Sequence, residues 1–189
     1  MNKTIEQIFA ESIQVKQETL KKNLPQIIQA AEAMIKALKA GHKLFFCGNG
    51  GSAADSQHIA AEFVGRFQKE RKAWPAIALT TDTSALTALG NDYTFDIVFS
   101  RQLQALGQKG DVLVAISTSG NSKNVIEAVK YAKSVGIVTV GVTGGNGGHL
   151  AGICDIAIVA ASSKTARIQE SHLVIFHSIC ELVETTLTA

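Results

Sequence analysis

The chain has 189 residues, of which 46% are hydrophobic, a size and composition that suit one domain with a substantial buried core. Its 18 basic and 16 acidic side chains give a net charge of +2 without long runs of either sign, which argues against a surface for nucleic acid or for an anionic membrane. The first eleven residues are too polar for a signal peptide, and no apolar stretch approaches the roughly 18 residues that span a bilayer. We therefore expect a cytoplasmic protein whose ligand is a small molecule.

Two amphipathic helices are predicted at the start of the chain. Apolar side chains recur at three- and four-residue spacing over residues 5–20 and again over residues 24–38, with a junction near residues 23–25. We interpret these two segments as a helical hairpin.

Strands and helices are predicted to alternate after residue 41. Short apolar runs that end at Gly, Ser, Thr or Asp predict strands at residues 43–47, 76–79, 112–116, 138–142 and 156–159. Helical composition predicts helices at residues 53–67, 84–89, 95–106, 122–135 and 166–186. This alternation is typical of an α/β fold in which helices sandwich a five-stranded parallel sheet.

The predicted helices carry more apolar surface than a five-stranded sheet can cover. We expect a homo-oligomer that packs the N-terminal helices, residues 1–40, and the last helix against symmetry mates, since closed symmetric assemblies commonly bury such faces. The alternative is that both N-terminal helices fold back over the chain's own sheet.

A glycine-rich loop follows the first predicted strand and begins the next helix. The loop comprises Asn49, Gly50, Gly51 and Ser52. Glycines let the backbone approach a ligand closely, and the free N–H groups at the start of a helix favour an anion. The spacing of Gly48, Gly50 and Ala53 also fits the dinucleotide pattern G-x-G-x-x-G/A, but the first acid after the second strand, Asp82, lies much further on than the roughly 20 residues that this fingerprint expects. The loop therefore favours a phosphate over a dinucleotide.

A hydroxyl-rich loop follows the third predicted strand, again at the start of a helix. It comprises Ser117, Thr118, Ser119, Gly120, Asn121 and Ser122. Hydroxyl and backbone N–H groups at such a position suit one phosphate held by neutral donors. Alternatively, Ser119 or Ser122 only caps the helix. Because two such loops follow parallel strands, at the edge where these sheets bind ligands, we favour phosphate binding.

The two loops resemble those of the sugar isomerase (SIS) domain family, whose members bind phosphosugars, and the closer similarity is to the phosphoheptose isomerases. The resemblance covers nearly the whole chain and includes residues 58–62 (HIAAE), 90–92 (GND) and 167–172 (RIQESH), followed by His177. It implies one SIS domain over residues 1–189, with a flavodoxin-like, three-layer fold. It also implies conversion of sedoheptulose 7-phosphate to glycero-manno-heptose 7-phosphate, towards the heptose of bacterial lipopolysaccharide, in a zinc-containing homotetramer.

The same resemblance implies roles for individual residues. The zinc ligands it implies are His58, Glu62, Gln169 and His177. It makes Glu62 the base that moves a proton between C1 and C2, and His177 the acid–base group that acts on the oxygens or opens the sugar ring. The substrate-binding residues it implies are Asn49, Gly50, Gly51, Ser52, Glu62, Asn91, Asp92, Ser117, Thr118, Ser119, Ser122 and Gln169.

Helix geometry supports one part of this site and complicates another. His58 and Glu62 are four residues apart on a predicted helix, so both side chains project from one face beside the first loop. Gln169 and His177 are eight residues apart, which is about 12 Å along a regular helix. Either the first turn around Gln169 is distorted, or the site combines residues from more than one subunit.

Two other functions remain open at this point. One is a non-catalytic SIS protein that binds a phosphosugar or regulates the initiation of replication. The other is an isomerase for a shorter or amino-substituted sugar phosphate, because a pocket discriminates only weakly against a missing group.

Overall fold

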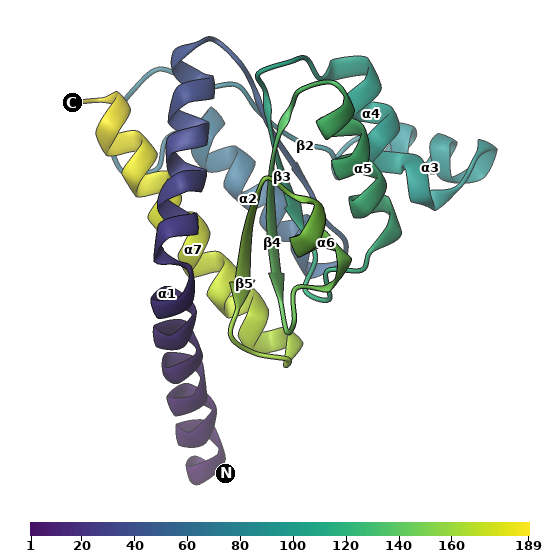
Figure 1. The fold of residues 1–189 in the computed structure, drawn as a ribbon. Helices are drawn as coiled ribbons and strands as arrows, with labels where there is room; N and C mark the ends of the chain where they lie inside the picture. The colour runs from purple at the N-terminus through teal and green to yellow at the C-terminus, as the bar shows by residue number, and fades with distance from the viewer.

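The computed structural model describes residues 1–189 and contains a five-stranded parallel sheet with helices on both faces (Figure 1). The strands are β1 (Leu44–Cys47), β2 (Ala76–Ala78), β3 (Val112–Ile116), β4 (Val138–Gly144) and β5 (Ile156–Ala160). The helices are α1 (Asn2–Lys39), α2 (Gly51–Val64), α3 (Thr83–Asp92), α4 (Val98–Leu106), α5 (Lys123–Ser134), α6 (Gly148–Ile153) and α7 (Thr165–Leu187), with a 3₁₀ turn η1 (Phe95–Ile97). The predicted α/β sandwich is therefore confirmed.

The strands separate two hydrophobic cores because successive side chains point to opposite faces of the sheet. In β1, Leu44 and Phe46 pack with side chains of α1, α2 and α7, whereas Phe45 and Cys47 pack with those of α4 and α5. In β3, Val114 belongs to the same core as Leu44 and Phe46, and Leu113 belongs to the core of Phe45 and Cys47. Both faces of the sheet are thus covered, which explains why the strands read as continuous apolar runs.

The predicted N-terminal hairpin is wrong, because α1 is one continuous helix of 38 residues. Pro25 lies on the exposed side of this helix, so the hydrogen bond that proline removes is lost towards solvent. Asn23 is buried on the opposite side, where its side-chain amide pairs with the backbone of Val159 in β5. The Asn-Leu-Pro sequence is therefore accommodated within the helix, and α1 runs along α7 and over β5 (Figure 1).

The two predicted ligand loops lie at one edge of the sheet. The strand order is β2-β1-β3-β4-β5, so the chain leaves β1 towards β2 on one side and returns to β3 on the other. The loop after β1 and the loop after β3 flank this switch point, where open parallel sheets bind their ligands. Cys47 and Ala115 are paired in the sheet just before the two loops. No helix of the chain combines the length and the hydropathy that crossing a membrane requires.

Candidate active site

The two loops are joined by a pair of reciprocal hydrogen bonds. Asn49 of the first loop donates to the side-chain oxygen of Asn124 at 2.8 Å, and Asn124 donates back to Asn49 at 2.9 Å. Asn124 is buried in the first turn of α5. The start of α2 and the start of α5 are therefore held side by side, so that both helix N-termini can face one anion. Asn124 was not among the predicted residues, because its role depends on this contact.

The second loop does not act as a simple helix cap. Ser122 occupies the N-cap position of α5 but makes no capping hydrogen bond, and its hydroxyl lies 3.0 Å from the hydroxyl of Ser117. The hydroxyl of Ser119 accepts a hydrogen bond from the N–H of Asn121 at 3.2 Å and is not a helix cap. Gly120 has φ +68°, and a side chain there would collide with the carbonyl of Gly147. The loop is thus a tight turn lined with hydroxyls, which is compatible with the expected phosphate site.

His58, Glu62 and His177 come together on the face of α2 that meets α7. His58 Nε2 lies 3.1 Å from Glu62 Oε1, and the two side chains are 43% and 22% exposed. The rings of His58 and His177 meet edge to face, with centroids 5.2 Å apart. His58 follows Gly51 by seven residues, which places it about 10 Å along α2 from the loop. The structure therefore places two imidazoles and a carboxylate close together, about 10 Å along α2 from the first loop.

Gln169 contacts the first loop and lies in regular helix. It is part of α7, which begins at Thr165, so the expected alternative of a distorted first turn is wrong. Its side-chain amide packs so closely against Gly51 that a Cβ at position 51 would overlap it. Glycine at position 51 is thus needed for the approach of Gln169. Gln169 and His177 are eight residues apart in one regular helix, so their backbones lie about 12 Å apart along α7.

Three of the four expected zinc ligands have the usual donor chemistry, since Zn²⁺ accepts imidazole nitrogen and carboxylate oxygen; the amide oxygen of Gln169 is a less usual ligand. In the chain, however, no three His, Cys, Asp or Glu side chains are arranged to hold a metal ion. His58 and Glu62 instead contact each other, and Gln169 faces Gly51. The donors therefore fit zinc in kind, and a complete coordination shell requires their rearrangement or a contribution from another subunit.

Asn91 and Asp92 lie apart from these groups. They end α3, where the amide of Asn91 donates to the carboxylate of Asp92 at 2.9 Å, and both are exposed. Helix α3 packs on α4 and η1, at the side of the sheet opposite α7 (Figure 1). A single chain therefore does not bring Asn91 and Asp92 to Glu62 and His177.

Two further titratable side chains are Asp55, which lies beside His58 on α2, and His172, which is part of the core. Asp55 precedes His58 by one turn of α2; burial raises its pKa, although nearby His58 opposes this effect. Its Oδ2 is buried without a hydrogen-bond partner. His172 is fully buried, with Nε2 3.0 Å from the carbonyl oxygen of Thr143, so it belongs to the core. Sequence spacing could have indicated Asp55, which lies at i−3 from His58 on the same helix face.

Comparisons with known proteins agree with this architecture. Residues 7–144 match the SIS domain family. The phosphoheptose isomerase of Campylobacter concisus is 59% identical over 155 residues, which is 82% of this chain and 82% of that protein. Among solved structures, phosphoheptose isomerase GmhA from Neisseria gonorrhoeae has a TM-score of 0.92 and 49% identity, covering 97% of this chain and 98% of that one. A phosphoheptose isomerase from Francisella tularensis has a TM-score of 0.93 and 40% identity, covering 97% of each chain.

Proposed function

The chain belongs to the SIS domain family and, within it, to the phosphoheptose isomerases. We propose that it converts D-sedoheptulose 7-phosphate to D-glycero-D-manno-heptose 7-phosphate. One observation carries the proposal. The His58–Glu62 pair lies on α2, the helix that begins at the first phosphate loop, and it meets His177 of α7. The product is an aldose phosphate of the kind used for heptose of lipopolysaccharide, and the cytoplasm is the compartment we propose.

The reaction moves a carbonyl from C2 to C1 through an enediol, so a proton leaves C1 and a proton returns at C2. Glu62 is the base for this transfer, and the adjacent His58 orients its carboxylate. His177 moves protons to and from the sugar oxygens. Neutral hydroxyl and N–H donors of the two loops hold the phosphate, together with the first turns of α2 and α5.

A zinc ion is part of the proposal. His58, Glu62, Gln169 and His177 would hold it, and a bound zinc ion would polarise the carbonyl as a Lewis acid. The protein residues that bind the sugar phosphate remain those expected from the sequence, with Asn49 supported by Asn124.

A homotetramer with active sites near subunit interfaces is also proposed. The outer end of α1 extends beyond the rest of the chain (Figure 1) and exposes Ile5, Ile8, Phe9 and Ile13. Further along, α1 and α7 flank a mainly apolar cavity of about 610 Å³ to which Leu20, Leu24, Val174 and Leu182 contribute. A second subunit would cover both surfaces, and it would offer a route by which Asn91 and Asp92 reach a neighbouring site.

Replacement of the acid–base groups tests the isomerase directly. Glu62→Gln or His177→Ala should lower turnover of sedoheptulose 7-phosphate at least about 100-fold, since a positioned acid or base contributes roughly 10²–10⁴ in rate. Proton exchange in D₂O followed by NMR measures the enediol step in the same samples. Glu127→Gln, which changes an exposed carboxylate paired with Lys130 on α5, is the matched control and should leave turnover unchanged.

Two results would contradict the proposal. Near-normal turnover in either variant would remove the roles given to Glu62 and His177. Phosphosugar binding by the wild type without any exchange at C1 or C2 would instead support a non-catalytic binding protein.

A further inference from the structure

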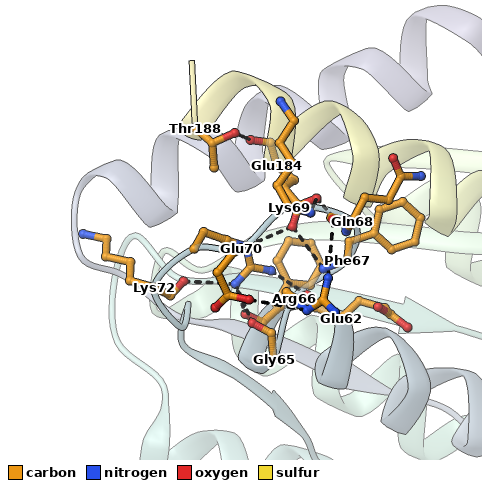
Figure 2. A network of polar contacts seen from close by, with 12 residues as sticks. Glu62, Gly65, Arg66, Phe67, Gln68, Lys69, Glu70, Lys72, Glu184 and Thr188 are labelled. Atoms are coloured by element: carbon orange, nitrogen blue, oxygen red, sulfur yellow. Dashed lines mark hydrogen bonds and ion pairs between the residues drawn. The ribbon is translucent and has the colours of Figure 1, made fainter.

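The segment that connects α2 to β2 is folded around a buried ion pair. The Glu184 carboxylate accepts hydrogen bonds from the backbone N–H groups of Phe67, Gln68 and Lys69, at 3.0, 2.7 and 2.8 Å (Figure 2). It also accepts one from Nε of Arg71 at 3.2 Å, and the two charged side chains are only 4% and 2% exposed. Glu184 of α7 therefore anchors a segment that lies more than a hundred residues away in the sequence.

The other edge of the Arg71 guanidinium closes the end of α2. Its Nη2 donates to the carbonyl of Glu62 at 2.6 Å, and its Nη1 donates to the carbonyls of Phe63 and Gly65 at 2.9 and 3.0 Å. The last carbonyls of a helix have no intrahelical partner, so a cation with several N–H groups is well suited to this position. The guanidinium also stacks on Trp74, 3.7 Å from the ring centroid. The last turn of α2, which carries Glu62, is thus held by one side chain.

The same segment contacts the second proposed acid–base residue. The ring of Phe67 lies 5.6 Å from the ring of His177, at an interplanar angle of 38°. His177 and Glu184 are seven residues apart on α7, which is two turns, so both lie on the face that meets this segment. Phe67 is therefore fixed by Glu184 through its N–H and packs against His177 through its ring.

We propose that Arg71 and Glu184 are positioning residues. They hold the segment after α2, residues 65–73, against both α2 and α7, an arrangement called the clamp below, and so they fix the relative positions of Glu62 and His177 for proton transfer. This inference rests on the proposed isomerase function. Stability alone does not account for the arrangement, because a buried ion pair is commonly no more stabilising than apolar residues of similar volume. Nε of Arg71 bonds to Glu184 and Nη1 also reaches the carbonyl of Lys72, but Nη1 and Nη2 make three hydrogen bonds to carbonyls at the end of α2, beside the proposed base.

Arg71→Lys tests the hydrogen bonds to the end of α2 separately from the ion pair with Glu184. A lysine keeps a cation beside Glu184 but cannot make the set of hydrogen bonds to the carbonyls of Glu62, Phe63 and Gly65. We expect kcat to fall by up to about 100-fold, a loss that a displacement of about 1 Å of a reacting group can cause. KM should change less than about threefold, because the phosphate loops are unaltered. Lys72→Ala, which removes an exposed cation in the same segment, is the control and should retain both constants.

Arg71→Ala allows chemical rescue. Guanidinium ion added at millimolar concentration should restore part of kcat, because the site against Trp74, Glu184 and the α2 carbonyls is shaped for that ion. Ammonium at the same ionic strength should not. Hydrogen exchange at the amides of Phe67, Gln68 and Lys69 reports the clamp without any need for turnover, and it should quicken in the variant and slow again with guanidinium.

The outcomes separate this inference from the function on which it rests. No isomerisation by the wild type would contradict both. Normal wild-type turnover together with an unchanged kcat in Arg71→Lys, or an equal change in kcat and in KM without rescue, would contradict the inference alone. Because Arg71→Ala leaves Glu184 buried without a cation, Arg71→Lys carries the test if the alanine variant does not fold.

Discussion

At the scale of the residue, the two histidines of α7 differ in burial, and only His177 is exposed enough for the acid–base role proposed for it. His177 is partly exposed beside His58, whereas His172 is fully buried next to Thr143. Burial lowers the pKa of His172 to about 4, and the hydrogen bond to the Thr143 carbonyl opposes this effect only in part. His172 is therefore a neutral core residue at neutral pH.

The low pKa of His172 predicts a loss of stability in mild acid. The unfolded chain binds the proton near pH 6.5 and the folded chain only near pH 4, so the unfolded state binds more protons between these values. The contribution to the free energy of unfolding is complete above pH 6.5 and falls by about 3 kcal/mol as the pH reaches 4. Urea unfolding at pH 7 and at pH 5 should show about 2 kcal/mol of this decrease, and His172→Gln should lack it. An NMR titration that places the His172 pKa near 6.5 would contradict the prediction.

At the scale of the element, α1 protects the edge of the sheet. Edge strands present unpaired backbone groups, and β5 is such a strand. The amide of Asn23 accepts from the N–H of Val159 at 2.9 Å and donates to its carbonyl at 3.0 Å, while Thr19 accepts from the N–H of Ala161 at 2.9 Å. Two side chains of one helix thus pair the edge as a sixth strand would.

This pairing predicts that Asn23→Ala is destabilising. The substitution leaves the N–H and the carbonyl of Val159 without partners in a partly buried place, which should lower the free energy of unfolding by about 2 kcal/mol. Denaturant unfolding measures the change, and Gln29→Ala on the exposed side of α1 should change it by less than about 0.5 kcal/mol. Equal effects of the two substitutions would show that Asn23 does not protect the edge.

At the scale of the whole molecule, the outer end of α1 exposes a set of apolar side chains. Phe9 and Ile13 are 66% and 55% exposed, although polar groups of the same stretch of α1, at Ile8 and Ser12, bond to α7. Apolar patches of this kind mark interaction surfaces, and a symmetric assembly covers them. The proposed tetramer therefore has α1 as its main contact.

A charge at this surface should weaken the assembly. Phe9→Glu with Ile13→Glu should shift the mass measured by light scattering from a tetramer to smaller species, because an unpaired charge is costly to bury. Turnover should become dependent on protein concentration if a neighbouring subunit completes the site. Gln14→Glu, which adds a charge on the same exposed length of α1, is a control for charge alone. An unchanged mass in the double variant would exclude this part of α1 from the interface.

Much of the fold and a part of the site follow from local pattern. The five strands, five of the seven helices and the two loops are predicted close to their observed bounds, because apolar periodicity and turn residues act over a few neighbouring positions. The short helix α6 is not predicted. The proximity of His58 and Glu62 also follows from helical spacing. Local pattern misled at residues 23–25, where Asn and Pro are typical of a helix end but α1 continues.

The sequence by itself determined the alternation of elements and the residue types at the two loops, since both depend on short-range periodicity and composition. Only the tertiary structure decided that Asn49 meets Asn124, that Gln169 lies against Gly51 and that Arg71 pairs with Glu184. These partners are between 75 and 118 residues apart in the chain. Their meeting depends on the order of strands in the sheet and on the packing of α2 against α7, which no local pattern records.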